Sequence, residues 1–533
     1  MARAAILAGM IALWSADASA RAVVDAFAPE ALAVTIYRDP DRGVGQAMAR
    51  ERPRGFAMIT ETRQVTLPPG ESTIRFTGVA EGMVAVSAIV TGLPGGTIEK
   101  NRNADLLSPA ALVDGTLGNR VTITRTDPAS GAERSEDAVI RTRADGGLVL
   151  ETAAGFEAVR CSGLPERLSF DRVPAGLSAQ PVYSIDTRDD AGGSYRVELT
   201  YLAWGFDWQT HYVARVADRD RGEGLTLDLL SWLTVLNDNG QSFPDAELLV
   251  VAGRLNVESD FRQLADPPTA RPLRLTCYPL GSTAAGSPEQ KFGAPPPPPP
   301  LGISAPPMAE SITVTGARMA DSMMRAPAMM AQEEQLGDLK LYRVPEPVTV
   351  SAKGLKQVAF LHREGVQGRL VYEAPCAPLR GGAGAESARL RFETVNDARH
   401  GLAAALPMGG ITFFEPSSAG DLLLAEEQLR DHAEGQDVEI ALGESAQVQL
   451  TCASTGDAER AAAGDWSPMR GVLANANPDP VSVRLLLGRS DQWRVRGLRG
   501  TRVKDGVIVW EGQVPANGRR QVEWDVRPAT AVD

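Results

Sequence analysis

The feature of this sequence that most constrains its fold is the spacing of its apolar residues, which come in short runs separated by glycine, proline and asparagine. In 197–201 and 225–229 every second residue is apolar, as expected of strands with one buried face. Turn-forming segments such as Asn237-Asp238-Asn239-Gly240 stand between these runs. We therefore predict a mainly β protein made of several antiparallel sandwich or small-barrel domains.

The N-terminus has the three parts of a secretory signal peptide. A basic residue, Arg3, precedes an apolar run over 4–14, and Ala18-Ser19-Ala20 has the small-residue pattern of a cleavage site. The apolar run is about half of the roughly 20 residues that a transmembrane helix needs. We predict a signal peptide at 1–20, no transmembrane segment in the mature chain, and a location in the periplasm or at the periphery of the outer membrane.

The rest of the chain divides where the pattern of strands and turns changes. Leu32–Arg38 is a candidate strand, and 64–67 and 72–76 flank Pro68-Pro69-Gly70 as a strand and a returning strand would flank a turn. The predicted domains are an N-terminal β domain at 21–105, a small barrel-like or sandwich module of about five strands at 106–190, and a β-sandwich region in two parts, 191–280 and 338–533.

A proline-rich segment separates the two parts of the β-sandwich region. It runs over 281–337 and contains the unbroken proline run 295–300, followed by five methionines between Met319 and Met330. Prolines in series favour polyproline II and lack the N–H donors that a sheet needs. We predict a long disordered insertion, with strand pairing between the segments on either side of it.

The net charge limits the partners that the surface can attract. The chain has 54 Lys and Arg against 67 Asp and Glu, a formal net charge of -13. A surface of this sign repels nucleic acid and anionic lipid. We therefore expect no nucleic-acid partner.

The histidines and cysteines form no recognisable metal motif. The four histidines are scattered, with no HExxH and no HxH, and the four cysteines form no CxxC. We expect neither a metal nor another cofactor. In an oxidising compartment the cysteines allow three alternative pairings. Cys277 and Cys376 bracket the insertion, each just beyond a strand-like run, and are the preferred disulfide pair.

Segments from both ends of the mature chain carry a family resemblance. They include VELTYLAWGFDWQTHYVARV at 197–216, WLTVLNDNGQSFPDAELLVVAGRLN at 232–256, VIVWEGQVPANGRRQVEWDV at 507–526 and, near the start, VTIYRDPDRG at 34–43. These segments resemble bacterial exported proteins with the mucoidy inhibitor A-like C-terminal domain of unknown function. The matched positions are mostly turn residues and core aromatics, so the resemblance implies architecture and supplies no catalytic residue. Family members with a coiled coil between their two parts differ from this chain, in which 106–170 has a β pattern.

One stretch holds the densest group of aromatic residues in a chain that is only 5% aromatic. The group comprises Trp204, Phe206, Trp208 and Tyr212, with Asp207 and His211 among them. An aromatic ledge beside polar groups could stack on a sugar ring or hold a peptide. Core packing explains the same residues without a ligand, and it is the interpretation we favour.

The insertion contains a short strand-like segment, ESITVTG, at 310–316. Its core, Ile312, Thr313, Val314 and Thr315, resembles the motif near the N-terminus of TonB-dependent outer-membrane receptors, where an exposed segment pairs with a partner by strand addition. The resemblance implies an accessory protein that pairs with outer-membrane transport machinery. The segment lies in mid-chain here, which differs from the receptors.

No catalytic motif stands out, since the chain lacks both a G-x-S-x-G elbow and a phosphate-binding loop. We predict a non-catalytic binding or scaffolding component of the cell envelope, with an envelope protein or a glycan as its partner. The alternative is a periplasmic hydrolase acting on glycan or peptide. Its paired carboxylates would be defined by their separation in space, which a sequence does not give.

Overall fold

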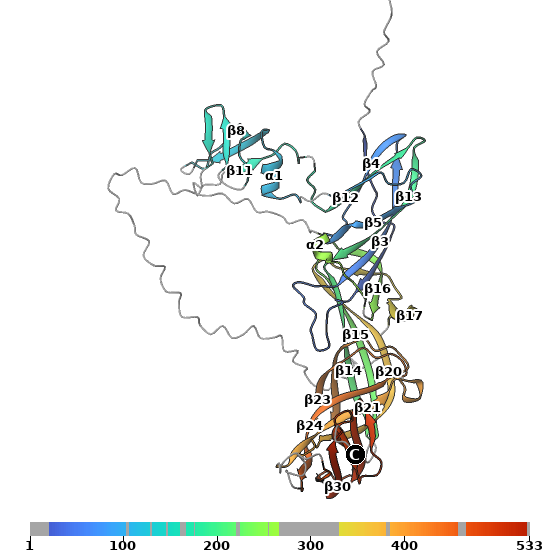
Figure 1. The fold of residues 1–533 in the computed structure, drawn as a ribbon. Helices are drawn as coiled ribbons and strands as arrows, with labels where there is room; N and C mark the ends of the chain where they lie inside the picture. The colour runs from blue at the N-terminus through green and yellow to red at the C-terminus, as the bar shows by residue number, and fades with distance from the viewer. Residues whose placement is uncertain are drawn as a thin grey trace, which may run out of the picture. The chain divides into compact units, whose positions relative to one another are not determined.

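The computed structural model describes residues 21–102, 106–127, 130–144, 148–159, 167–174, 176–219, 224–253, 255–265, 330–379, 384–456 and 465–529. Within these residues the protein is mainly β, as predicted (Figure 1). The chain forms two compact units. The N-terminal unit comprises 1–33, 58–203 and 260–281, and the C-terminal unit comprises 34–57, 204–259 and 282–533. The predicted signal peptide, 1–20, lies outside the described residues.

The N-terminal unit contains a four-stranded sheet. Its order is β1 (Ala22–Asp25), β4 (Gly70–Thr77), β12 (Val182–Asp189) and β6 (Glu99–Arg102). β13 (Gly193–Trp204) pairs with β5 (Met83–Thr91) in a different sheet, which also includes β3 (Phe56–Leu67). Alternate residues are buried in β4 and along most of β3 and β13, whereas β12 is buried at six consecutive residues. The rings of Phe76 and Tyr183 pack with their centroids 6.3 Å apart. The period of two in the sequence of β3, β4 and β13 therefore reports one buried face per strand.

The turn at Pro68-Pro69-Gly70 differs from the prediction. β3 ends before it and β4 begins at Gly70, but the two strands belong to different sheets and do not pair with each other. The sequence correctly gives two strands and a break. The predicted pairing of the two strands is wrong, because a short turn after a strand can lead either into a hairpin or into a strand of another sheet.

The module predicted at 106–190 contains the expected number of strands. A five-stranded antiparallel sheet has the order β10 (Gly155–Ala158), β9 (Val149–Thr152), β8 (Glu133–Ile140), β7 (Arg120–Thr126), β11 (Arg167–Ser169). A short helix that the sequence analysis missed, α1 (Pro109–Gly115), packs Ala110 and Val113 into its core. Ser108 caps this helix, and its side chain accepts a hydrogen bond from the N–H of Ala111. The strands after 170 belong to other sheets, so the module is shorter than predicted.

In the C-terminal unit, seven strands surround one apolar core. Their order is β23 (Gly420–Leu429), β22 (Gly409–Ser417), β14 (Phe206–Arg219), β15 (Gly224–Asn237), β20 (Gly354–Pro375), β21 (Glu386–Val395), β24 (Asp437–Ser454), and β23 lies against β24 again. Figure 1 shows the long strands β14, β15 and β20 side by side. A cavity of about 20 Å³ inside is lined by residues from all seven strands, among them Tyr212, Phe392 and Phe413. We call this part the barrel.

Strand pairing crosses the insertion, as predicted. β15 pairs antiparallel with β20 along most of its length, and β16 (Phe243–Ala252) pairs with β18 (Leu339–Arg343) and β19 (Val348–Val350). The insertion was predicted at 281–337, and its residues 281–329 lie outside the described residues. Its last part is different from the prediction, because Gln332–Leu336 forms strand β17, which pairs with β18.

The chain ends in a second core, which we call the C-terminal sandwich. It contains β25 (Ser467–Asn475), β26 (Val481–Arg489), β27 (Trp493–Arg496), β28 (Arg502–Lys504), β29 (Val507–Val514) and β30 (Gly518–Pro528). β24, β25, β30 and β27 form one series of paired strands, and the end of β20 with β26, β29 and β28 forms the other. Trp510, Trp524 and the apolar residues of β26 are buried in this core. β20 and β24 are long enough to belong to both the barrel and the sandwich.

The barrel and the sandwich repeat one local structure, an asparagine at a strand end. Asn237 donates its side-chain N–H to the carbonyls of Gln241 (2.9 Å) and Ser351 (3.1 Å). Asn475 does the same to Asp479 (2.9 Å) and Pro515 (3.0 Å). In each case the residue two positions later donates its backbone N–H back to the asparagine oxygen, at 2.9 Å. These buried amides satisfy carbonyls at the ends of two neighbouring strands.

Candidate functional site

The C-terminal unit contains a polar groove of about 170 Å³. It lies between the loop 38–55, which connects β2 (Ala31–Tyr37) to β3, and the strands β14, β22 and β23. Its lining includes Arg42, Gln46, Gln209, His211, Glu426 and Gln428. We call this cavity the groove.

Glycines on β22 let the groove form next to β14. A Cβ at Gly409 would collide with the backbone and side chain of Thr210, and one at Gly410 would lie 3.0 Å from Nδ1 of His211. These strands run parallel, with Thr210 opposite Gly409 and His211 opposite Gly410. The absence of side chains at these two positions of β22 therefore leaves the His211 imidazole room to lie across the strand.

A buried ion pair holds the loop to the barrel. The guanidinium of Arg42 donates to both carboxylate oxygens of Asp207, at 3.1 and 3.2 Å, and also to the carbonyl of Trp208. Arg42 is 8% exposed and Asp207 is 1% exposed. Asp207 also accepts the backbone N–H groups of Asp39 (3.2 Å) and Trp208 (2.8 Å). One carboxylate thus fixes the loop, the strand and the arginine together.

Burial dominates the electrostatics of this pair. Desolvation raises the pKa of Asp207 from 3.8 to about 6, although the charge of Arg42 and the two backbone N–H groups act in the opposite direction. Desolvation also lowers the pKa of Arg42. The carboxyl group therefore changes its ionisation close to neutral pH, next to the groove.

Further contacts hold the same loop. Arg38 forms a bidentate pair with Asp431, with N–O distances of 3.1 and 2.9 Å, and Asp431 accepts the N–H of Met408 at 2.8 Å. Although burial opposes it, the hydrogen bonds and charge of Arg38 lower the pKa of Asp431. The backbone N–H of Met48 donates to the side-chain oxygen of Gln209 at 3.1 Å. The loop wall of the groove is therefore fixed at several points.

The opposite wall carries an imidazole and a carboxylate. Nε2 of His211 lies 3.0 Å from the hydroxyl oxygen of Thr412. Burial lowers the pKa of His211, and the nearby Glu426 opposes this shift only in part. His211 is therefore neutral at pH 7. Glu426 and Gln428 are exposed on β23 and offer an acceptor and an amide to the solvent side of the groove.

The structure corrects the prediction of ligand-facing aromatics. Phe206, Trp208 and Tyr212 are completely buried, and Trp204 is half-buried. Tyr212 donates its hydroxyl to the carbonyl of Pro407 at 2.7 Å, inside the barrel. These rings cannot face a ligand, so the favoured core interpretation is correct for the three buried ones.

The groove residues of the same strand were overlooked, although the sequence contained the signal for them. The aromatics occupy 206, 208 and 212, so a strand directs Asp207, Gln209 and His211 to its other face. Glu426 and Gln428 could not be assigned in this way. They reach the groove only because β22 pairs with both β14 and β23.

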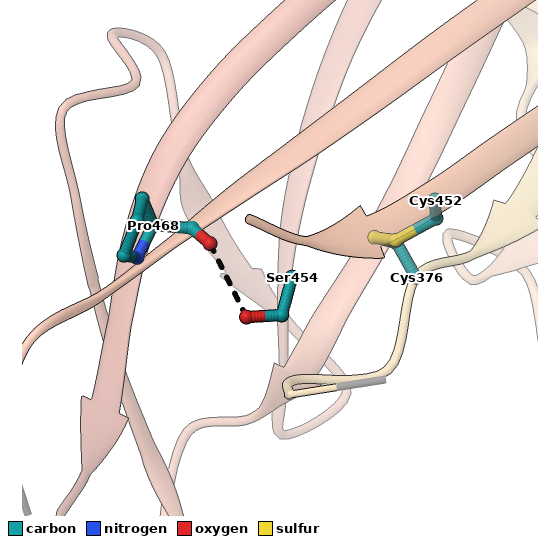
Figure 2. The surroundings of a disulfide bond; sticks show 4 residues. All are labelled: Cys376, Cys452, Ser454 and Pro468. Atoms are coloured by element: carbon teal, nitrogen blue, oxygen red, sulfur yellow. Dashed lines mark hydrogen bonds between the residues drawn. A yellow bond between two sulfur atoms is a disulfide. The ribbon is translucent and has the colours of Figure 1, made fainter. Parts of the chain in front are cut away.

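The preferred disulfide, between Cys277 and Cys376, is wrong. Cys376 is joined to Cys452, with Cα atoms 5.8 Å apart and a sequence separation of 76 (Figure 2). Both sulfurs lie in the core of the C-terminal sandwich, where Cys376 follows β20 and Cys452 is in β24. Figure 2 also shows Ser454, whose hydroxyl donates to the carbonyl of Pro468 at 3.4 Å. Cys161 and Cys277 lie outside the described residues.

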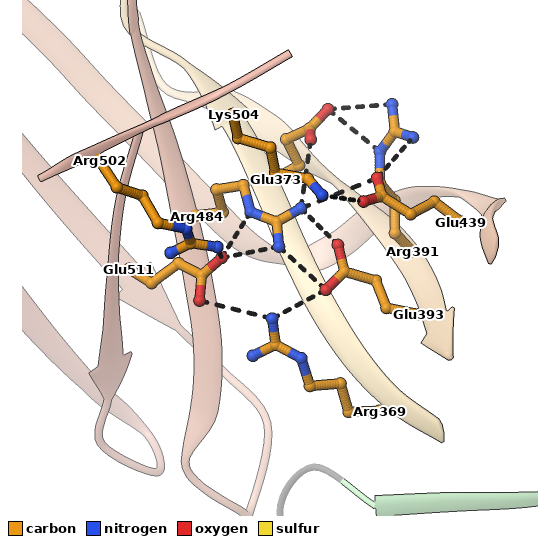
Figure 3. A network of polar contacts seen from close by, with 9 residues as sticks. All are labelled: Arg369, Glu373, Arg391, Glu393, Glu439, Arg484, Arg502, Lys504 and Glu511. Atoms are coloured by element: carbon orange, nitrogen blue, oxygen red, sulfur yellow. Dashed lines mark hydrogen bonds and ion pairs between the residues drawn. The ribbon is translucent and has the colours of Figure 1, made fainter. Parts of the chain in front are cut away.

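A second charged cluster lies between the barrel and the sandwich and is centred on Arg484. This guanidinium is 1% exposed and donates to Glu511 at 2.7 Å and to Glu393 at 2.9 Å (Figure 3). The surrounding members are Arg369, Glu373, Arg391, Glu439, Arg502 and Lys504. Although burial opposes it, hydrogen bonds from Arg502 and Arg484 lower the pKa of Glu511 to about 2. We call this cluster the Arg484 network; every carboxylate in it is paired with at least one cation, as in a structural ion-pair network.

Other predicted features are not placed by the structure. The strand-like motif containing Ile312, Thr313, Val314 and Thr315 lies outside the described residues and stays a prediction. Among the described residues, no helix has the length and apolar character needed to cross a bilayer. In that same part of the chain, no His, Cys, Asp and Glu side chains group as three potential metal ligands.

Comparisons with known proteins do not assign a family. No protein-family model matches the sequence, and a search of curated proteins finds no significant match. The resemblance to mucoidy inhibitor A-like proteins therefore stays a prediction.

Proposed function

We propose that the protein is an exported, non-catalytic binding component of the bacterial envelope, and that the groove holds its ligand. The observation that carries this proposal is the composition of the groove walls. Three amide side chains, Gln46, Gln209 and Gln428, line it with a neutral imidazole and one exposed carboxylate. Such sites use a few placed polar groups to orient a ligand.

The proposed ligand is a glycan segment. Amide side chains both donate and accept hydrogen bonds, and a carboxylate only accepts them. In a neutral imidazole, one ring nitrogen donates a hydrogen bond and the other accepts one. This mixture suits hydroxyl and acetamido groups, which also donate and accept. A strongly anionic ligand would be repelled by Glu426, since Arg42 is already bound to Asp207.

A hydrolase is the second candidate, and one contact favours it. His211 and Thr412 lie within hydrogen-bond distance, at 3.0 Å, as a general base and a hydroxyl nucleophile would. Glu426 is opposite Thr412 in the pairing of β22 with β23. This arrangement differs from that of a glycosidase, which works with two carboxylates. Loss of glycan or peptide turnover in Thr412→Ala, with ligand binding retained, would favour the hydrolase.

Calorimetric titration of the mature protein with soluble fragments of envelope glycan tests the proposal. We expect saturable binding that Glu426→Ala combined with Gln428→Ala weakens at least about tenfold, because two hydrogen-bonding groups are lost. Gln447→Ala, an exposed glutamine on β24, is the matched control and should bind normally. Binding that is absent, or equal in all three proteins, would contradict the proposal.

Export is proposed on the N-terminal sequence and is tested separately. Cell fractionation with N-terminal sequencing should find the protein outside the cytoplasm, beginning at Arg21. An uncleaved protein in the cytoplasm would contradict it.

A further inference from the structure

Two glutamines of the groove have their amide groups oriented by backbone hydrogen bonds. The side-chain oxygen of Gln46 accepts the N–H of Gly43 at 2.9 Å, within the loop 38–55. The side-chain oxygen of Gln209, on β14, accepts the N–H of Met48 at 3.1 Å. Because only the oxygen of an amide side chain can accept a backbone N–H, each contact also fixes where the NH₂ group lies.

The NH₂ groups of these two glutamines are left over for a ligand. Both residues line the groove, where Gln46 is exposed and Gln209 is half-buried. Among the described residues, neither NH₂ group has a hydrogen-bond partner, whereas each amide oxygen already accepts one hydrogen bond. The side of the groove next to the loop therefore presents mainly donors.

The side of the groove formed by β23 presents an acceptor. Glu426 is exposed on this strand, and β22 separates β23 from β14 by pairing with both. Carboxylate oxygens accept hydrogen bonds and do not donate them. Of β22, the glycines Gly409 and Gly410 line the groove, so these two positions place no side chain between the donors and the carboxylate. Glycine within a strand often marks a place where a ligand approaches the backbone closely.

We infer that the groove is selective for an N-acetylated amino sugar, and that Gln46 and Gln209 donate to the carbonyl oxygen of its acetamido group. This inference rests on the proposed function, because it requires a glycan in the groove. A trans amide is planar, and its C=O and N–H point in opposite directions. The acetamido group therefore accepts from the glutamines while its N–H points towards Glu426. A hydroxyl in its place has a single polar atom, which does not reach both sides.

Attachment of the loop to the barrel accounts for the oxygens of the two glutamines but not for their NH₂ groups. A glutamate at either position would accept the same backbone N–H, in a charge-assisted hydrogen bond. Loop attachment therefore does not require an amide at these positions. Substitution of glutamine by glutamate separates the two roles, because it keeps the acceptor for the loop and removes the donor to the ligand.

The experiment measures by calorimetry the affinity of the mature full-length protein for two uncharged oligosaccharides of equal length and linkage. One is a chito-oligosaccharide, an oligomer of N-acetylglucosamine. The other is the corresponding cello-oligosaccharide, which has a hydroxyl in place of each acetamido group. We expect the wild type to bind the acetylated oligomer at least about tenfold more tightly, because it makes hydrogen bonds that the hydroxyl does not make. Gln209→Glu and Gln46→Glu should each reduce this preference at least about threefold, since each removes one of the two donors.

The ratio of the two affinities is the decisive quantity, because both oligosaccharides are uncharged and an added carboxylate affects them alike. Gln447→Glu, which introduces the same charge at an exposed position of β24 outside the groove, is the matched control and should leave the ratio unchanged. An unchanged melting temperature shows that a variant keeps the loop attached. If Gln209→Glu lowers the melting temperature, Gln46→Glu decides, since it changes an exposed residue.

Equal affinity of the wild type for the two oligosaccharides would overturn the inference and leave the proposed glycan binding intact. A preference that both groove variants retain would also overturn it, because the glutamine donors would then not cause the selectivity. Binding of neither oligosaccharide would overturn it as well. In that case the titration with envelope glycan fragments decides separately whether the proposed function also fails.

Discussion

Two arginine–carboxylate groups of the C-terminal unit use the same chemistry in different surroundings. At the groove, Arg42 and Asp207 are both nearly inaccessible, and burial raises the pKa of Asp207 to about 6. In the Arg484 network, Glu511 is 22% exposed in its side chain, and its arginine partners lower its pKa to about 2. The same pairing therefore shifts the two carboxyl groups in opposite directions.

The difference lies in the number of cations and in the remaining contact with water. Glu511 receives hydrogen bonds from Arg484 and Arg502 and also feels Arg369. Asp207 has one arginine partner and loses most of its hydration. The attraction within a single buried ion pair hardly compensates the free-energy cost of removing its charges from water. In a partly solvated network that cost is smaller and more cations share it, so the attraction does compensate it. The groove should consequently respond to pH, and the sandwich should not.

The largest expected effect is the loss of the disulfide in the C-terminal sandwich. Among the described residues, only the sandwich contains such a covalent link. Replacing Cys376 and Cys452 together by alanine should lower the free energy of unfolding by about 4 kcal/mol, because the disulfide closes a long loop in the unfolded chain. Urea denaturation of the oxidised wild type and of the variant measures this. A loss below about 1 kcal/mol would mean that the sandwich does not depend on the link.

Removing the centre of the network should have the next largest effect. Arg484→Met leaves Glu393 and Glu511 near one another with fewer cations, and we expect a loss of about 3 kcal/mol. Arg489→Met, an exposed arginine at the end of the same strand, is the control and should cost less than about 0.5 kcal/mol. Equal effects of the two substitutions would contradict a central role for Arg484.

A smaller loss is expected at the groove. Arg42→Met deprives Asp207 of its partner, but the carboxyl group can take up a proton near neutral pH and avoid remaining as a buried charge. We expect a loss of about 2 kcal/mol at neutral pH, smaller than for Arg484→Met. A larger loss than for Arg484→Met would reverse the proposed contrast.

The smallest effect is the pH dependence itself. A carboxyl group with a raised folded-state pKa stabilises the protein at low pH, and this contribution is lost as the pH rises through about 6. Between about pH 5 and about pH 8, Asp207 should therefore reduce stability by about 1 kcal/mol, and Asp207→Asn should remove this slope.

Glu511 provides the opposite case. Because its pKa is lowered in the folded protein, ionised Glu511 stabilises the fold. This stabilisation is complete at any pH above the pKa of the unfolded state, and it is lost only as the pH falls towards about 2. Glu511→Gln should therefore destabilise equally across about pH 5 to about pH 8. Denaturation curves of both variants at several pH values decide the matter, and parallel slopes for Asp207→Asn and wild type would contradict the assignment.

The sequence predicted strands well because one-faced burial leaves a period of two. It predicted poorly which strands pair and which cysteines form a disulfide. β4 leaves β3 for another sheet, and Cys376 meets Cys452 because β20 continues from the barrel into the sandwich. Neither outcome follows from local residues, since each depends on which strands meet over long separations.

The asparagine corners illustrate the same limit. Asn237-Asp238-Asn239-Gly240 was correctly interpreted as a break between strands. Its equivalence to Asn475 appears only once both side chains are seen to bridge the same kind of strand ends. The groove was likewise hidden, because His211 on β14 and Glu426 on β23 are brought to one surface only by the pairing of both strands with β22.

Hydrogen exchange measured by mass spectrometry, with and without saturating envelope glycan fragments, tests the central claim most directly, because it locates the ligand on the chain. If the groove is the binding site, the ligand should slow exchange in peptides covering 42–47, 209–211, 408–410 and 426–429, which line it. Peptides of the sandwich, such as those covering 467–475, should exchange at unchanged rates. Protection confined to other segments, or none at a concentration that saturates binding, would contradict the assignment of the groove.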